Sequence, residues 1–299
     1  MSGLQNNTDY SCTVTATNSA GTGPAAAALS VTPAAARTAA ITPVLGGFSA
    51  GVSVEIFRAD NGARIAIGTT ADDGKATLTY SSTYAGIQVI KLTGSATAKY
   101  YDERTDTLQP FGADKFLLTV VPAAVANLPN TSVSATVLTN AIAIAAGIDV
   151  SASTGVAVPI GLSAAAVKTS TDKVLSTFGL DPNKVDPLTV PAYLGVKDQG
   201  TGTKLQGNEA ALTYGAAIIA ITKLTPAATD VASFTQTIAV SIKSDTVKQT
   251  VPQVTTLPSV YQEVVRTTVA PAAQQLITTI PAPGSSPWDT GVWDTANWF

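Results

Sequence analysis

Two short patterns in this sequence contain residues that could support catalysis or phosphate binding. Ser170 and Lys173 have the Ser-x-x-Lys spacing, in which a lysine amine can activate a serine nucleophile. The Ser-Asp-Asn and Lys-Thr-Gly patterns that accompany such a site are missing, so a solvated helix face is the favoured interpretation. Residues 200–204 read Gly-Thr-Gly-Thr-Lys, but they lack the Gly-Lys-Ser/Thr ending of a phosphate-binding loop and indicate only a flexible loop.

Carboxylates gather in two places along the chain. Asp60, Asp72 and Asp73 lie in predicted turns, where they could bind Ca²⁺, although Asp is also an ordinary turn residue. The acidic segment 102–106 could supply the paired carboxylates of a glycosidase, but no aromatic sugar platform is evident beside it. We therefore expect no cofactor, and Ca²⁺ is the alternative left open.

The composition argues against several classes of function. The chain has 299 residues, no His and a single Cys, Cys12, so the commonest general base and zinc ligand are missing and no internal disulfide can form. Charged residues make up 12% of the chain, its net charge is −3, and Lys and Arg are not clustered, so we expect no nucleic-acid partner. No apolar run is long enough to span a bilayer. Residues 1–5 show no secretory signal, which would then lie on a longer precursor or not be used in export.

Residues 1–33 are predicted to form two β-strands. Tyr10, Cys12 and Val14 alternate with polar residues, so they are expected to face one side of the first strand. A turn is expected at residues 18–24, and the second strand follows it. Because two strands cannot bury a core alone, either the true start was trimmed or these strands complete a sheet supplied by another molecule.

This segment resembles the end of a fibronectin type III domain. The matching residues are Leu4, Thr8, Tyr10, Val14, Ala16, Asn18, Gly21, Gly23 and Pro24. The resemblance implies that the two strands are the last of a β-sandwich. Residues 34–47, which are rich in Ala, Pro and Gly, are predicted to be a linker.

Residues 48–122 show the alternation of successive β-strands. Turn sequences at residues 60–62 and 72–74 separate neighbouring strands, and about six or seven strands are expected in all. Residues 68–78 resemble the strand–turn–strand of carboxypeptidase-regulatory-like, or transthyretin-like, β-sandwiches. In exported bacterial proteins such modules are usually spacers or adhesive units, and the resemblance implies a role of that kind.

After Pro122 the hydrophobic period changes to that of helices, and residues 123–280 are predicted to form an Ala-rich α-helical bundle. Ser163 is a predicted N-cap, and Asn208 is expected to open another helix. The expected helices cover residues 134–147, 163–179, 208–224, 230–242 and 258–277. The predicted fold class is thus α+β with several domains, an immunoglobulin-like or prealbumin-like β-sandwich followed by an α-helical bundle.

The order of several short motifs resembles a β-sandwich-plus-helical module of large surface-exposed proteins of Gram-negative bacteria. The motifs are residues 93–94, 100–103, 117–122, 136–147, 178–180 and 214–215. This resemblance spans residues 48–280, and it implies a location on the cell surface rather than any chemistry.

Residues 281–299 form a Trp-rich C-terminal tail that begins with a Pro-rich extended stretch. The chain's three Trp residues, Trp288, Trp293 and Trp298, all lie in this tail, and Phe299 follows them. Because large aromatic side chains gain much free energy from burial, the tail is expected to latch onto its own module or to contact another subunit. Trp-Asp tails also resemble the ends of some bacteriophage structural proteins.

These patterns together predict a non-enzymatic structural or adhesive protein, extracellular and on a bacterial cell surface. Its expected partners are copies of itself, in a homo-oligomer or filament, and other surface proteins. The residues expected to make these contacts are Tyr10, Cys12, Val14, Trp288, Trp293, Trp298 and Phe299. The alternative is a bacteriophage virion appendage or tail component. An enzyme ranks third, and a deep polar pocket with perturbed carboxylates would favour it.

Overall fold

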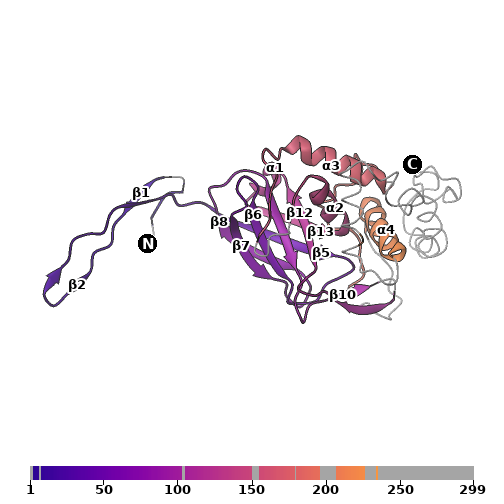
Figure 1. Ribbon diagram of the computed structural model, residues 1–299, viewed down its shortest axis with the longest axis horizontal. Coiled ribbons are helices and arrows are strands. Elements are labelled where there is room, and N and C mark those ends of the chain that lie inside the picture. Colours follow the sequence, from indigo (N-terminus) through magenta and orange to yellow (C-terminus); the bar gives the residue numbers. More distant parts are fainter. Residues whose placement is uncertain are drawn as a thin grey trace.

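The computed structural model describes residues 3–6, 8–102, 105–149, 155–178, 180–195, 207–225 and 234. Within these residues the chain has a β-rich α+β fold, with several antiparallel sheets and four helices. A long two-stranded ribbon near the N-terminus extends away from the rest of the described chain, which we call the body (Figure 1).

The ribbon and the body contain the following elements. The ribbon has strands β1 (Tyr10–Cys12), β2 (Thr17–Asn18), β3 (Gly21–Thr22) and β4 (Leu29–Val31). The strands of the body are β5 (Ala36–Val44), β6 (Ser53–Arg58), β7 (Arg64–Thr69), β8 (Ala76–Ser81), β9 (Gln88–Thr93), β10 (Lys99–Asp102), β11 (Thr107–Pro110), β12 (Phe116–Val121) and β13 (Asn130–Thr136). Its helices are α1 (Ala123–Ala126), α2 (Val137–Ala145), α3 (Ala164–Thr177) and α4 (Glu209–Leu224).

Two larger sheets form most of the β part of the body. One has four antiparallel strands in the order β12-β9-β6-β7, and the other has three strands in the order β13-β5-β8. Strand β5 pairs antiparallel with β8 and parallel with β13. The outer strands β7 and β8 lie close to each other, as do β12 and β13, so the edges of the two sheets approach each other on both sides.

The exposure pattern of β8 follows directly from its sequence. Ala76, Leu78 and Tyr80 are buried, whereas the Thr or Ser residue that follows each of them is exposed. Such an alternation places one face of the strand on the core and the other in water. Gly74, in the preceding turn, has a φ of 75°, and a Cβ there would lie 2.1 Å from the Phe48 carbonyl oxygen. Glycine is therefore required at this turn.

Strands and helices both contribute to the larger of two clusters of buried hydrophobic side chains. Val54 of β6 and Leu175 of α3 belong to the same cluster of buried side chains. The cluster also contains Phe48, Tyr100 and Phe111, and the rings of Phe48 and Phe111 meet edge to face with centroids 5.0 Å apart. Because the helices pack into the core of the sheets, this arrangement does not support a separate helical bundle, which stays a prediction.

Helix α2 is almost wholly buried, and its polar side chains bond to strand β12. Thr136 caps the helix by accepting hydrogen bonds from backbone N–H groups of the first turn. Thr139 Oγ1 lies 2.8 Å from the Leu118 carbonyl oxygen, and Asn140 Oδ1 accepts a hydrogen bond from Leu118 N at 3.1 Å. The helix begins later than the predicted start, because the residues before it belong to β13.

The starts of α3 and α4 confirm two predicted helix boundaries. The Ser163 hydroxyl accepts a hydrogen bond from Ala166 N at 3.2 Å, and Asn208 Oδ1 accepts one from Ala211 N at 2.8 Å. Each side chain thus satisfies a backbone donor that has no partner within its own helix. The two later predicted helices lie outside the described residues, apart from Phe234.

The predicted linker over residues 34–47 is wrong, because β5 occupies most of it and is the central strand of its sheet. Ile41 and Val44 of this strand are buried in the core. Ala has a low strand propensity, but pairing on both sides and burial override it. Strand β13 likewise lies within the region predicted to be helical, where it pairs with β5.

Candidate interaction site on the N-terminal ribbon

The ribbon is a hairpin of paired strands with a tight tip. Strand β1 pairs antiparallel with β4, and Tyr10 lies opposite Val31 while Cys12 lies opposite Leu29. Strands β2 and β3 pair next to the tip, as the predicted turn at residues 18–24 implies. The ribbon therefore contains the two predicted strands and the turn between them.

Local interactions explain why the chain reverses at the tip. Asn18 Oδ1 accepts a hydrogen bond from Ala20 N at 2.9 Å, which is a typical turn-forming contact. Gly21 has a φ of 129°, a value that residues with a Cβ rarely adopt. The hydroxyl oxygens of Thr17 and Thr22 lie 2.9 Å apart across the paired strands.

One face of the ribbon is apolar. Residues directly opposite each other on paired strands point to the same face, so Tyr10, Cys12, Leu29 and Val31 share one face. Val14 follows the end of β1 at Cys12, and the alternation of the sequence predicts that it lies on this face as well. Val14 is 73% exposed and Leu29 is 67% exposed, which is unusual for aliphatic side chains. We call these five residues the apolar ribbon face.

The backbone edges of the ribbon have no neighbouring strand among the described residues. Each of its sheets has two strands, so both outer edges carry unpaired N–H and C=O groups. The two larger sheets of the body differ, because their outer strands lie close to each other. An isolated two-stranded hairpin is at best marginally stable in water, so the ribbon is the described element that would gain most from a partner.

The ribbon is almost free of charge. Asp9 is its only charged side chain in residues 1–33, and the Thr32 hydroxyl donates a hydrogen bond to it at the base of the ribbon. Tyr10 contributes a polar group at the same end, where its hydroxyl oxygen accepts a hydrogen bond from Gln5 N at 2.8 Å. The apolar face itself carries no charge that would have to be desolvated in a contact.

The structure brings together two of the residues predicted to make contacts and adds two more. Tyr10 and Cys12 share a face with Leu29 and Val31, and Val14, beyond the end of β1, is exposed. The alternating sequence Leu-Ser-Val could have indicated Leu29 and Val31, but which face of the ribbon they occupy depends on the register in which the strands pair. The other predicted contact residues, Trp288, Trp293, Trp298 and Phe299, lie outside the described residues.

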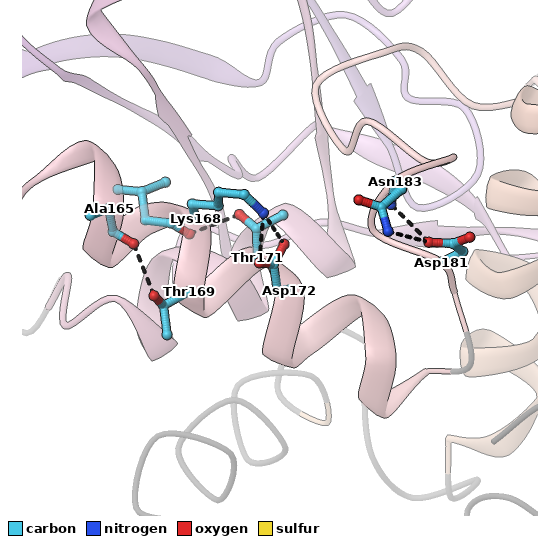
Figure 2. A network of polar contacts seen from close by, with 8 residues as sticks. Ala165, Lys168, Thr169, Thr171, Asp172, Asp181 and Asn183 are labelled. Atoms are coloured by element: carbon cyan, nitrogen blue, oxygen red, sulfur yellow. Dashed lines mark hydrogen bonds and ion pairs between the residues drawn. The ribbon is translucent and has the colours of Figure 1, made fainter.

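The Ser-x-x-Lys pattern lies on α3, beside an open hollow of about 330 Å³. On the same helix the Lys168 ammonium group pairs with Asp172 at 2.7 Å (Figure 2). The Thr171 hydroxyl donates to the Val167 carbonyl oxygen at 2.9 Å. These contacts connect successive turns of α3, whereas Ser170 and Lys173 are themselves half-buried, and the interpretation of their pattern as a solvated helix face stays a prediction. The predicted loop at residues 200–204 lies outside the described residues.

The turn carboxylates take part in local structure. Asp60 forms an ion pair with Arg58 at 2.6 Å, and the hydrogen bond from Arg58 holds the pKa of Asp60 below its ordinary value. Asp73 Oδ1 accepts a hydrogen bond from Lys75 N at 3.0 Å within its turn. In the part of the chain that the structure describes, no group of three or more His, Cys, Asp or Glu side chains could hold a metal ion.

The acidic segment 102–106 does not form an open pair of carboxylates in the described residues. Asp102 is fully buried. Asp106 accepts a hydrogen bond from the Tyr101 hydroxyl at 2.5 Å. Glu103 and Arg104 lie outside the described residues. The two described carboxylates, Asp102 and Asp106, therefore do not form an open pair, and the part of the glycosidase alternative that depends on Glu103 lies outside the described residues.

No described helix is both long enough and apolar enough to cross a membrane. Comparison of the chain with protein-family models, with curated proteins and with solved structures gave no match.

Proposed function

We propose that this chain is a non-enzymatic structural or adhesive component of a bacterial cell surface, and that it assembles through its terminal segments. The observation that supports the proposal is the apolar ribbon face, which is exposed, uncharged and carried on a ribbon with unpaired edges. Exposed apolar surface of this kind marks a contact with another macromolecule. The low charge of the chain and its surface rich in Thr and Ser agree with an exported structural protein.

The proposal includes a finer description of the body. The two larger sheets would be the layers of an immunoglobulin-like or prealbumin-like β-sandwich, with the helices packed at one side. Their shared core supports this description, since residues of both sheets belong to one buried cluster. An experimental structure in which the two sheets lie face to face, about 10 Å apart, would establish the sandwich.

The self-association part of this proposal is tested by two matched substitutions. Val14→Asp places a charge on the apolar ribbon face, whereas Thr13→Asp places the same charge one residue away on the opposite face. We expect the wild-type chain and Thr13→Asp to associate as protein concentration rises, and Val14→Asp to remain monomeric. Sedimentation velocity measures the association, and electron microscopy shows whether filaments form.

Two outcomes would contradict the proposal. One is a wild-type chain that stays monomeric over the whole accessible concentration range and binds no surface component. The other is turnover of a small compound by the purified protein, because that would favour an enzyme instead.

A further inference from the structure

We propose that two copies of this chain exchange strand β5 as they fold, so that the N-terminal segment of each copy completes a sheet of the other. The segment that moves is residues 1–44, which contain the ribbon and β5. This inference goes beyond the proposed function, because the exchange does not involve the apolar ribbon face. Either contact can exist without the other.

The slot that β5 fills is made by later parts of the chain. Strand β8 pairs with residues 36–41 on one side of β5, and β13 pairs with residues 38–44 on the other. Ile41 is fully buried in this position, and Ala39 is buried as well. Without β5, the edges of β8 and β13 that now face it would be unpaired. A second copy carries the identical strand, so the slot itself selects a second copy as the partner.

The local sequence of β5 contributes little to its position. Ala36, Ala39 and Ala40 have a low strand propensity. Pro43 has no N–H group to donate to a neighbouring strand. Pairing with β8 and β13 and burial in the core therefore supply most of the stabilisation. The body of a second copy offers the same neighbours and the same core, so exchange preserves the contacts of β5 and changes only the turn that follows it.

One tight turn joins β5 to the rest of the body. Val44 and Gly47 form a bridge, so the chain reverses within residues 45–46. Gly47 is anchored to the body, because its N–H group donates to the Leu194 carbonyl oxygen at 2.8 Å and its carbonyl oxygen accepts from Tyr101 N at 2.9 Å. The chain can therefore open only before Gly47. A short hinge of this kind next to a terminal element favours its exchange between copies.

The ribbon does not obstruct the exchange. It projects away from the sheets (Figure 1), and its large apolar side chains are exposed instead of packed in the core. The ribbon therefore moves with β5 without losing buried contacts of its own. Strand β5, in contrast, must be out of the core before it can pair with another copy. We expect exchange when the chain folds at high concentration, and not when folded monomers are concentrated.

The short hinge limits how the two copies are arranged. An extended chain spans ~3.3–3.6 Å per residue, so an open hinge from Val44 in one body to Gly47 in the other covers only about 10 Å. The two bodies must then lie next to each other at this end of β5. A symmetrical pair, in which each copy gives one strand and receives one, leaves no slot empty. We therefore expect a closed dimer.

Disulfide crosslinking between β5 and β8 tests the exchange. Thr38 and Thr79 are cross-strand partners, and their hydroxyl oxygens lie 3.5 Å apart. Thr38 N donates to the Pro129 carbonyl oxygen on the other side of β5. Thr38 and Thr79 thus form a non-hydrogen-bonded pair, whose Cα spacing of ~4.5 Å suits a disulfide. With Thr38→Cys and Thr79→Cys in a Cys12→Ser background, the disulfide joins two chains only if β5 has been exchanged.

The matched control places both cysteines in strands that stay together during exchange. Ser53 of β6 and Thr69 of β7 are also cross-strand partners. The hydrogen bond from Thr70 N to the Val52 carbonyl oxygen makes them a non-hydrogen-bonded pair too. Ser53→Cys with Thr69→Cys, in the same background, should form its disulfide within one chain in monomers and dimers alike. Any covalent dimer of this control measures random oxidation between molecules.

Both variants are unfolded in urea and refolded with reduced thiols at high and at low protein concentration. Size-exclusion chromatography then separates monomer from dimer before oxidation. We expect a dimer fraction that grows with the refolding concentration. In this fraction the variant with cysteines at 38 and 79 should give at least about tenfold more covalent dimer than the control, because exchange raises the effective concentration of the two thiols.

Two results would overturn the exchange, and they bear differently on the proposed function. If dimers form but the cysteines at 38 and 79 crosslink within single chains, the exchange is wrong and the assembly role stands. If no dimer forms at any refolding concentration, both the exchange and self-association are wrong. Val14→Asp, added to the crosslinking variant, should leave the yield of exchanged dimer unchanged, because position 14 lies outside the slot.

Discussion

At the scale of single residues, the Tyr214 hydroxyl joins three segments of the body. Its oxygen lies 2.7 Å from Thr136 Oγ1 and 3.1 Å from the Pro187 carbonyl oxygen. Thr136 Oγ1 already accepts hydrogen bonds from the N–H groups of α2, so its own proton is free to bond to Tyr214. Tyr214 in turn donates to Pro187, and α4, α2 and the loop before α4 are held together.

Removing this hydroxyl should destabilise the body. Tyr214→Phe keeps the buried ring but removes the acceptor for the Thr136 hydroxyl proton, whereas Ser134 still donates to the Pro187 carbonyl oxygen. We therefore expect the free energy of unfolding to fall by about 1–3 kcal/mol. Tyr10→Phe, which removes a hydroxyl from the ribbon, should leave the stability of the body unchanged. Urea denaturation followed by circular dichroism measures both. An unchanged midpoint for Tyr214→Phe would show that these hydrogen bonds contribute little.

The buried Tyr214 hydroxyl should make the free energy of unfolding depend on pH in the alkaline range. Burial raises the pKa of Tyr214, whereas tyrosine in an unfolded chain titrates near pH ~10. Above that pH the unfolded state loses a proton that the folded state retains, so this group's stabilising effect declines by up to ~1.4 kcal/mol per pH unit. The stability advantage of the wild-type chain over Tyr214→Phe should therefore shrink as pH rises through ~10. Denaturation curves at several pH values measure it, and a constant difference would contradict the prediction.

At the scale of elements, local and distant interactions determine different boundaries. Helices α3 and α4 begin where Ser163 and Asn208 cap them, and Gly147 has a φ of 97° just after α2, as expected of a glycine that ends a helix. Strand β5 has no comparable local signal, and its neighbours β8 and β13 come from distant parts of the chain. The starts of α3 and α4 were accordingly predictable, whereas the start of α2 and the strand that replaces the expected linker were not.

The cap of α3 can be tested by a matched pair of substitutions. Ser163→Ala removes the side-chain acceptor for Ala166 N, so we expect a loss of about 1 kcal/mol in the free energy of unfolding. Ser163→Asp keeps an acceptor and places a negative charge near the positive end of the helix, so stability should be retained. Thermal and urea unfolding measure the difference. Equal losses in the two variants would contradict the assigned cap.

At the scale of the whole molecule, the ribbon and the body differ in how they are held. The body has a core to which strands and helices both contribute, whereas the side chains of the ribbon are largely exposed. The expected separation into sheets and bundle would give two cores. A shared core instead couples α3 to the strands, so a substitution that destabilises the helix should also destabilise the sheets.

Leu175→Ala tests this coupling. Leu175 is fully buried in the shared core, and its truncation should cost about 2–5 kcal/mol. Hydrogen exchange should then accelerate in β5 and β13 as well as in α3. Val14→Ala, a truncation on the exposed ribbon, should leave exchange in the body unchanged. If hydrogen exchange accelerates in α3 while the strands keep their normal protection, the helix belongs to an independent unit.

The sequence by itself determined those features that depend on neighbours along the chain. Alternation marked Tyr10, Cys12 and Val14 as one face, turn glycines marked chain reversals, and side-chain caps marked helix starts. These signals are local because a turn or a cap is satisfied within a few residues. The predicted turns at residues 60–62 and 72–74 likewise lie between β6 and β7 and between β7 and β8.

Only the tertiary structure decided which strands pair and what they leave exposed. Leu29 and Val31 join the apolar ribbon face because of the register of β4 on β1, and β13 is a strand because it pairs with β5. Pairing register and burial depend on residues far apart in the sequence, and their energies override local propensity. For the same reason composition could suggest a contact-making protein, whereas the geometry of the exposed face had to come from the fold.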